Sequence, residues 1–462
     1  MATLQSEDVK ELKAKMTGEV LLPGDRDYDE ARTIWNGFFD RKPAVIARCA
    51  DAEDVASAVS FAAKHDLLLS VKGGGHNSAG TAMCDDGLCI DLSKMRNVTV
   101  DAKTGRAKVG GGALFSDVDA ETQIHGLACP GGIVSHTGVG GLTTGGGFGW
   151  ISRKHGMSVD NLVSAEVVTA DGKIVRASET ENPDLFWGIR GGGGNFGVVT
   201  LFEFQAANIG TEIYSGLIVK KFSDLKKYIQ FHREFVRTMP DEMTVWMVVR
   251  HAPPLPFLPE DVHGKLVVVV PFVYLGDAAE GEKLVKPIRE ITPSVGEMIG
   301  MNPWVGWQQA FDPLVSHGAR NYWKTHQLTD LSDDYIDVVE EFAQKFPSPQ
   351  CEIFMPHLEG APSRITETAT AFAHRKPPFN MNIHTRWENA TDDERCLAWC
   401  RALHKAAEPY AKGMYVNFLS DMDEAQAKQA YTPDVWNRLT VVKKKWDPTN
   451  LFRMNQNIKP AS

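Results

Sequence analysis

The sequence is poor in cysteine and has no long apolar run. Its seven cysteines are an odd number spread over 462 residues, the opposite of the dense, paired pattern of a secreted disulfide framework. No stretch reaches the ~18 consecutive apolar residues of a membrane-spanning helix, and Met1–Lys10 alternates charges where a signal peptide needs an apolar run. We therefore expect free thiols and a soluble, cytoplasmic protein with no membrane partner.

Positive charge is also in short supply. Lys and Arg number 49 against 59 Asp and Glu, a net charge of -10, so a nucleic acid would meet mostly like charge and is not an expected partner. With 23% charged and 43% hydrophobic residues the composition is that of an ordinary globular protein. The length is about three times the ~150 residues typical of one domain, which predicts more than one domain, in a monomer or a homodimer.

Several common catalytic motifs are missing. There is no phosphate-binding G-x-x-x-x-G-K-[ST] loop, no H-E-x-x-H, no G-x-S-x-G and no paired C-x-x-C, which removes the usual markers of nucleotide hydrolysis, zinc proteolysis and α/β-hydrolase chemistry. Gly192–Gly197 fits G-x-G-x-x-G, but a strand-like run follows it where a Rossmann fold needs a helix. Cys396, Cys400 and His404 would span about 12 Å along a helix, so we expect no metal site.

Glycine, in contrast, is concentrated in one region. Between residues 73 and 197 lie 27 of the 41 glycines, in clusters next to β-branched runs. Residues 53–72 predict a helix followed by a buried strand, Asp171-Gly172 predicts a hairpin turn within residues 165–176, and Asn182-Pro183 predicts a helix start. This part of the chain is therefore expected to be α+β.

The middle of the chain has a different character. From about 206 to 409 the glycine clusters stop, and strand-like runs at 217–219, 244–249 and 265–273 mix with helical stretches at 333–345 and 393–407. A second domain is expected there. After about 410 come a strand-like segment, Gly413–Phe418, an amphipathic helix ending near Lys445, and a polar tail.

The segment Gly73-Gly-Gly-His76-Asn-Ser78 directly follows the predicted buried strand. Successive backbone N–H groups in such a glycine turn can point at a phosphate, which suits a dinucleotide. His76 at its tip has two readings of equal weight from spacing alone. It is a structural histidine, or it is a covalent anchor or acid/base beside a bound cofactor.

These motifs, taken together, resemble a known family. The matching stretches are Arg41–Arg48, Gly73–Asn77, Gly138–Gly149, Asp160–Leu162, Asn182–Trp187, Arg190–Gly197, Tyr415–Phe418 and Asp447–Asn457. The sequence is similar to flavoproteins of the vanillyl-alcohol oxidase / p-cresol methylhydroxylase superfamily, in its berberine-bridge-enzyme-like branch. The resemblance covers about 20–205 and 410–460.

The resemblance implies a fold and a division of the chain. We expect an α+β protein with a two-subdomain FAD-binding domain of the p-cresol methylhydroxylase type, built from residues 1–205 and 410–462. Between these segments, residues 206–409 would form a substrate domain with an antiparallel sheet covered by helices.

The resemblance also implies the cofactor and its contacts. His76 falls on the family's 8α-histidyl attachment position. Val134 holds the position of the cysteine that forms a second bond in many relatives, so a single covalent bond to FAD is predicted. Thr137 stands where relatives usually have Val or Ile at a position linked to oxygen access, which leaves oxidase and dehydrogenase behaviour open. The other expected FAD contacts are Gly73, Gly74, Gly75, Asn77, Ser78, Thr137, Gly138, Gly141, Gly145, Gly146, Val198, Tyr415, Asn455 and Asn457.

Three residues are candidates for catalysis. In a Tyr-Val-Asn-Phe strand, Tyr415 and Asn417 would share one face, and the resemblance implies that this tyrosine acts on the substrate O–H or N–H. Glu352 is an acidic residue in an otherwise apolar predicted strand, which suggests a functional role for its carboxyl group. Glu352 and His357 would lie on opposite faces of that strand.

The expected function is that of an FAD-linked oxidase. Hydride would pass from an alcohol or amine carbon of a small organic molecule to flavin N5, and O₂ would reoxidise the flavin to give hydrogen peroxide. The missing cysteinyl link favours a substrate resembling a secondary metabolite. The alternatives are a carbohydrate (oligosaccharide) oxidase and a dehydrogenase that passes electrons to another acceptor.

Overall fold

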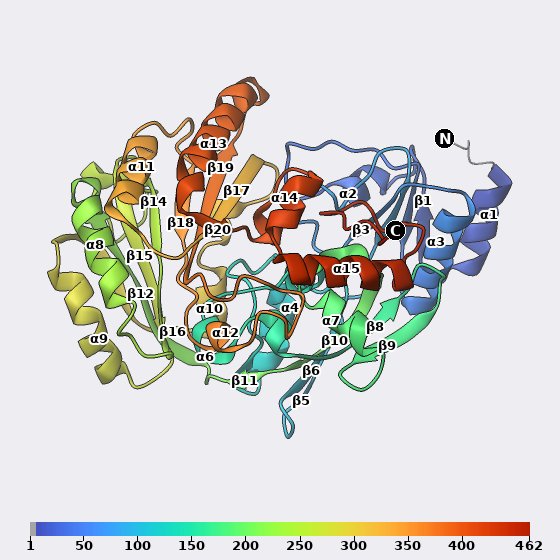
Figure 1. Ribbon diagram of the computed structural model, residues 1–462, viewed down its shortest axis with the longest axis horizontal. Helices are drawn as coiled ribbons and strands as arrows, with labels where there is room; N and C mark the ends of the chain where they lie inside the picture. Colours follow the sequence, from blue (N-terminus) through green and yellow to red (C-terminus); the bar gives the residue numbers. More distant parts are fainter. Residues whose placement is uncertain (1–5) are drawn as a thin grey trace.

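The computed structural model describes residues 6–462 and shows two lobes side by side (Figure 1). Both ends of the chain, coloured blue and red, lie in the right-hand lobe of Figure 1, and the middle of the chain forms the left-hand lobe. Residues 1–5 lie outside the described residues. The start of the predicted first domain and half of the segment that we searched for a signal peptide therefore lie outside them too. No helix in residues 6–462 is long and apolar enough to cross a membrane.

The first sheet of the right-hand lobe holds the strand that leads to His76. Its order is β1 (Glu19–Leu21), β2 (Val45–Arg48), β4 (Leu88–Asp91) and β3 (Leu69–Lys72), with β2, β4 and β3 parallel. Helix α3 (Ala52–Lys64) begins at Asp51, whose side chain accepts from the Asp54 N–H. The predicted helix followed by a buried strand is confirmed. Helices α1 (Ser6–Lys15) and α2 (Tyr28–Arg32) belong to the same lobe.

The second sheet is antiparallel and carries the glycine-rich connections. Its order is β5 (Val98–Asp101), β6 (Arg106–Gly110), β10 (Val198–Gln205), β8 (Leu162–Val168) and β9 (Ile174–Ser178). The β8–β9 hairpin turns at Gly172, whose φ of +75° suits glycine. The hairpin and the helix start at Asn182 are confirmed. The segments around this sheet are β7 (Leu127–Ala128), β11 (Ala207–Asn208), α4 (Phe115–Gln123), α5 (Val139–Thr144), α6 (Ser152–His155) and α7 (Pro183–Ile189).

The left-hand lobe is a long antiparallel sheet. Its order is β16 (Ser294–Pro303), β12 (Glu212–Lys221), β15 (Leu266–Tyr274), β14 (Met247–His251), β18 (Glu352–Met355), β19 (Phe379–Trp387), β17 (Arg320–Leu328) and β20 (Ala411–Gly413), and β13 (Met243–Val245) also pairs with β15. Helices cover its outer face (Figure 1): α8 (Leu225–Phe235), α9 (Ala278–Glu290), α11 (Asp333–Ala343) and α13 (Asp393–Ala407).

Alternation along the strands decides what reaches the site. On β18, Ile353 and Met355 are buried with the helix-facing core, so Glu352 and Phe354 point to the opposite face. Helices α10 (Trp304–Gln309) and α12 (Ala361–Arg364) lie in loops near the junction of the two lobes. The middle sheet spans Glu212 to Gly413, and the domain limits 205/206 and 409/410 stay predictions.

The C-terminal segment returns to the right-hand lobe through α14 (Glu424–Gln429) and α15 (Pro433–Trp446). On α15, Lys443 pairs with Asp447 at 2.7 Å, both fully buried, and Asp447 accepts from the backbone N–H of Leu451 and Phe452. This pair fixes the turn that leads into the tail. The expected strand at Tyr415–Phe418 is wrong, because these residues form a 3₁₀ turn (Val416–Phe418).

Candidate active site

Two glycine-rich loops meet where the FAD phosphates were expected. An added Cβ on Gly74 would lie 2.4 Å from the Gly138 backbone nitrogen, so the loops touch through bare backbone. Gly75 has a φ of +70° and Gly146 a φ of +130°, which only glycine adopts freely. The structure thus brings together the turn after β3 and the segment entering α5, two of the predicted cofactor segments.

Several of the residues predicted to contact FAD have polar side-chain atoms without a hydrogen-bond partner in the protein. Within residues 6–462, Ser78 Oγ, Asn455 Oδ1 and Asn457 Oδ1 are buried without a hydrogen-bond partner, an arrangement that a bound polar ligand would relieve. Asn77 differs, because its Oδ1 accepts from the N–H groups of Ala79 and Thr81 and so shapes the turn. The free polar atoms of Ser78, in the turn after His76, and of Asn455 and Asn457, in the C-terminal tail, suit a cofactor with many donors and acceptors.

The remaining predicted contacts have less direct roles. The side chain of Val198 is buried in an apolar cluster. Gly145 is covered by Asn417, whose Oδ1 would lie 1.9 Å from an added Cβ. Gly141 has nothing within 4 Å of that position, so its backbone is open to a ligand.

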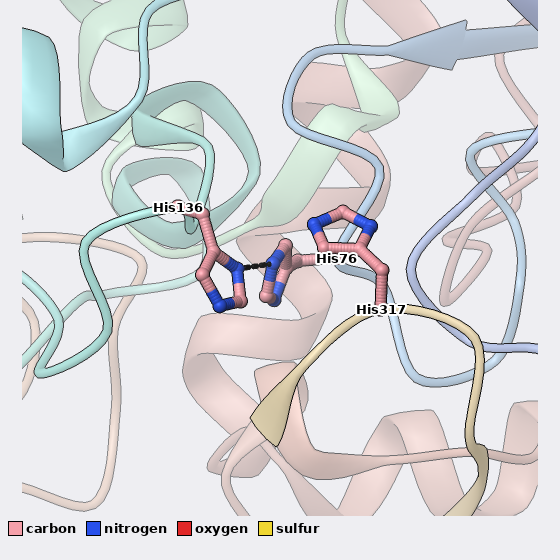
Figure 2. Close-up of side chains that lie close together, drawn as sticks. All are labelled: His76, His136 and His317. Carbon is pink, nitrogen blue, oxygen red and sulfur yellow. Dashed lines mark hydrogen bonds between the residues drawn. The ribbon is translucent and has the colours of Figure 1, made fainter. Parts of the chain in front are cut away.

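His76 is surrounded by aromatic and imidazole rings (Figure 2). Trp35 stacks on it with centroids 4.9 Å apart, and its Nε2 is hydrogen-bonded to His136 Nδ1 at 2.6 Å. Burial lowers the pKa of His76 well below its ordinary value, and the neighbouring His136, His317 and Arg386 lower it further. His76 is therefore a neutral imidazole, the form that can act as a nucleophile.

The three imidazoles of His76, His136 and His317 have ring nitrogens within 4.8 Å of one another, near enough for a metal ion. His76 Nε2 and His136 Nδ1, however, are joined by a hydrogen bond of 2.6 Å. The proton of this bond lies between the two nitrogens, so they do not both present a free lone pair to a metal ion. This geometry is that of a hydrogen-bonded pair of imidazoles, with the His317 ring beside it. That the protein needs no metal stays a prediction.

Tyr415 lies in the cradle, with its hydroxyl oxygen accepting two hydrogen bonds. Gly147 N–H and Asn417 Nδ2 each donate to it at 2.9 Å, and Asn417 Nδ2 also reaches the Leu142 carbonyl at 3.0 Å. Burial raises the pKa of Tyr415 to about 12, against the lowering effect of the two donors. Tyr415 and Asn417 are thus brought together by a direct hydrogen bond, although a turn and not a strand aligns them. Their role in catalysis stays a prediction.

An apolar cavity of about 90 Å³ lies between the glycine-rich segment and the inner face of the long sheet. One of its walls is the chain at Ile133, Val134 and Trp150, and the others include Leu217 and Phe354. Tyr415 packs in the same apolar cluster as Trp150, Leu217 and Phe354. Val134, at the position of the missing cysteine, therefore lines this cavity.

Glu352 closes one side of this cavity as part of an ion pair. Arg250 Nη1 donates to Glu352 at 2.7 Å, and His384 Nδ1 lies 2.9 Å from its other oxygen. Burial alone would raise the pKa of Glu352, but Arg250 and His384 outweigh it and hold the pKa at about 2. Glu352 is thus ionised, and both of its carboxylate oxygens already have a hydrogen-bond partner. This arrangement is better suited to positioning Arg250 and His384 than to accepting a proton from a substrate. His357 points away and is buried beside Arg153.

Sequence reasoning missed four residues of this site: Trp35, His136, Arg250 and His317. Only His136 had a usable signal, since it lies within the Val134–Gly138 segment that was examined for the cysteine. The others come from separate parts of the chain, and their partners are known only once the chain is folded.

Comparisons with known proteins agree with this arrangement. Residues 43–178 match a family described as FAD binding domain, and residues 414–459 match one described as berberine and berberine like. An FAD-linked oxidoreductase of Dictyostelium discoideum is 30% identical over 457 residues, covering 98% of this chain and 97% of the relative. The chain therefore belongs to the FAD-linked oxidoreductases of the berberine-bridge-enzyme-like branch, and it has the α+β fold of the p-cresol methylhydroxylase type.

Two solved structures are similar over nearly the whole chain. The 6-hydroxy-D-nicotine oxidase of Arthrobacter nicotinovorans has a TM-score of 0.87 at 28% identity, with 96% of this chain and 98% of that chain covered. A glucooligosaccharide oxidase of Acremonium strictum, described as having a 6-S-cysteinyl, 8α-N1-histidyl FAD, has a TM-score of 0.87 at 23% identity, with 98% and 99% covered. The expectation of an FAD-linked enzyme is thus confirmed.

Proposed function

We propose that this protein is an FAD-linked oxidase whose flavin is attached through His76 alone, and which oxidises an alcohol or amine carbon of a small, largely apolar molecule with O₂ as acceptor. The observation that carries this proposal is Tyr415, whose oxygen is fixed by two donors inside the glycine cradle. Its ring packs in the same apolar cluster as Trp150 and Phe354, which line the cavity.

The flavin would be held by the two glycine loops and by Ser78, Asn455 and Asn457, and when bound it supplies the hydride acceptor and the route to O₂. The hydrogen bond of His76 to His136 uses Nε2, which leaves Nδ1 for the link. Nδ1 is the N1 nitrogen in flavin nomenclature, the atom named for the glucooligosaccharide oxidase. Val134 cannot form a cysteinyl bond.

Tyr415 provides the proton acceptor for the substrate O–H or N–H. With both donors in place, its oxygen has a third direction for the substrate, and as phenolate it would accept the substrate proton while keeping Gly147 and Asn417 as donors. A pKa near 12 means that the phenolate is scarce at neutral pH. We therefore expect substrate oxidation to accelerate as the pH rises.

The cavity lining favours an apolar substrate over a sugar. Its walls are mainly aliphatic and aromatic, and its charged members, Arg250 and Glu352, are already paired with each other. An oligosaccharide would bury hydroxyl groups against such walls without partners, at a cost of about 1–3 kcal/mol each. The nicotine oxidase, whose named substrate class is an amine, is the more instructive relative.

Two measurements test the proposal. Acid-precipitated, washed wild type should retain flavin absorbance and in-gel fluorescence, whereas His76→Ala should not; flavin lost from the wild type would refute the linkage. Purified protein should then release hydrogen peroxide with members of a panel of apolar secondary alcohols and amines and not with oligosaccharides. Flavin reduction without peroxide would indicate a dehydrogenase, and peroxide from oligosaccharides alone would favour the carbohydrate alternative.

A further inference from the structure

Beside His76 lie two histidines that the proposed reaction does not use. Figure 2 shows His136, from the segment before α5, and His317, from the loop before β17, facing the His76 ring from two sides. The His136 and His317 ring centroids are 5.0 Å apart, and those of His76 and His317 are 5.6 Å apart. His76 and His136 are partly buried, whereas His317 is exposed.

The hydrogen bond fixes which nitrogen of His76 is reactive. A neutral imidazole has one N–H. If that proton is on His76 Nε2, it points at His136 Nδ1, 2.6 Å away, and the lone pair of His76 is on Nδ1. In the other tautomer the lone pair of His76 would face His136 and could not reach a ligand. Stacking by Trp35, with an interplanar angle of 17°, holds the ring in this orientation.

We infer that His136 is the proton acceptor that turns His76 into a nucleophile during covalent attachment of the flavin, and that His317 passes the proton to solvent. This inference rests on the proposed His76 linkage and adds the residues that make it. His136 is thus a positioning and proton-accepting residue for His76 and does not act on the substrate.

The attachment step balances as follows. The bond between His76 Nδ1 and the flavin 8α carbon forms, while one C–H bond of the 8α methyl group and the Nε2–H bond of His76 break. The two electrons of the broken C–H bond remain on the isoalloxazine ring, which is thereby reduced, and the proton of that bond passes to solvent. O₂ then takes the two electrons together with two protons from solvent and becomes hydrogen peroxide. The proton from Nε2 moves to His136 Nδ1.

The charges around the cluster show why the proton must leave it. Arg386, 5.8 Å from the Trp35 ring, disfavours a cation on each of the three histidines, and Lys72 also disfavours one on His317. Asp312 alone acts in the opposite direction, on His136, from its hydrogen bonds to Ser135. Burial lowers the pKa of His136 despite Asp312. A proton taken by His136 is therefore held weakly, and the exposed His317 is the adjacent outlet.

The test measures attachment, not turnover. Full-length flavin-free protein from a riboflavin-starved host is mixed with FAD in air, and samples are precipitated with acid to measure the flavin retained by the pellet. In His136→Asn, the amide oxygen can still accept from His76 but takes no proton. We expect attachment at least tenfold slower than in wild type, with unchanged non-covalent FAD affinity by fluorescence quenching. His125→Asn, at an exposed position, is the matched control and should behave as wild type.

A rescue experiment separates base catalysis from packing. In His136→Gly, added imidazole should restore attachment, whereas pyrazole, a ring of the same size but a far weaker base, should not. Equal rescue by both rings, or attachment by His136→Asn at the wild-type rate, would overturn the inference and leave the proposed function intact. Loss of all flavin from the wild type in acid would overturn both.

Discussion

Replacing Arg250 by methionine should reveal how strongly the buried ion pair below the cavity depends on both charges. The pKa of Glu352 is about 2, against the usual 4.5, and at 1.36 kcal/mol per pKa unit this corresponds to about 3 kcal/mol of folding free energy at neutral pH. The pKa in the folded state is depressed, so this stabilisation is complete above about pH 4.5 and is lost as the pH falls toward 2. Removing Arg250 leaves a buried carboxylate with His384 as its hydrogen-bond partner and only the weaker effect of Arg386 in addition.

The expected result is a loss of about 3 kcal/mol in the free energy of unfolding of Arg250→Met at pH 8, measured with urea. Burial would then raise the pKa of Glu352 above 4.5, so the deficit relative to wild type should shrink as the pH is lowered to 5 and the carboxyl group is protonated. Adding Glu352→Gln to Arg250→Met should recover part of the loss.

A matched control is available at the surface. Arg237 pairs with Glu234 at 3.2 Å, with the two side chains 53% and 63% exposed, and Arg237→Met should cost no more than about 1 kcal/mol. If Arg250→Met cost as little as this control, or if its cost did not change with pH, the ion pair would not be what holds Glu352 ionised.

Two further predictions concern the proposed cofactor cradle and the proposed catalytic tyrosine. Gly74→Ala would place a Cβ 2.4 Å from the Gly138 backbone, so the purified protein should lose its flavin by absorbance ratio, whereas Gly300→Ala, with open space around it, should keep it. Tyr415→Phe should slow anaerobic flavin reduction, followed by stopped-flow absorbance, by about 10²–10⁴-fold. In the wild type the rate of flavin reduction should rise with pH through the alkaline range. The same pH dependence of the rate in Tyr415→Phe would contradict the assignment.

The sequence predicted local structure well where short-range chemistry decides it. Helix α13 has the predicted bounds, Asp393–Ala407, and the hairpin at Asp171-Gly172 turns as expected. The strand expected at Tyr415–Phe418 was wrong. So short a run of residues also fits a 3₁₀ turn, which is closed by the Phe418 N–H on the Tyr415 carbonyl at 3.0 Å. What fixes that turn is distant in sequence: Asn417 reaches Leu142, and Tyr415 reaches Gly147.

The two glycine-rich segments of the proposed cofactor site could be singled out from motifs, but the residues that surround them could not. Gly74 and His76 are conspicuous in the sequence because a glycine triplet before a histidine has a physical use. Arg250 and His317, in contrast, belong to runs that look like an ordinary strand and loop. Arg250 acquires its role only from Glu352, 102 residues away, and no local pattern encodes such a pairing.

The tyrosine proposed to act in catalysis, Tyr415, links parts of the chain that are far apart in sequence. Tyr415 follows directly after β20, an edge strand of the middle sheet, yet its oxygen is fixed by Gly147 of the glycine-rich lobe. The tail beyond it is fastened to the same lobe, because Asn195 donates to the Gln456 carbonyl and accepts from the Ile458 N–H. Tyr415 is thus held from both sides, by the long antiparallel sheet and by the glycine-rich lobe. Its geometry should therefore depend on the correct docking of both lobes, and a covalent flavin, anchored at His76 in one of them, would add a fixed point to that junction.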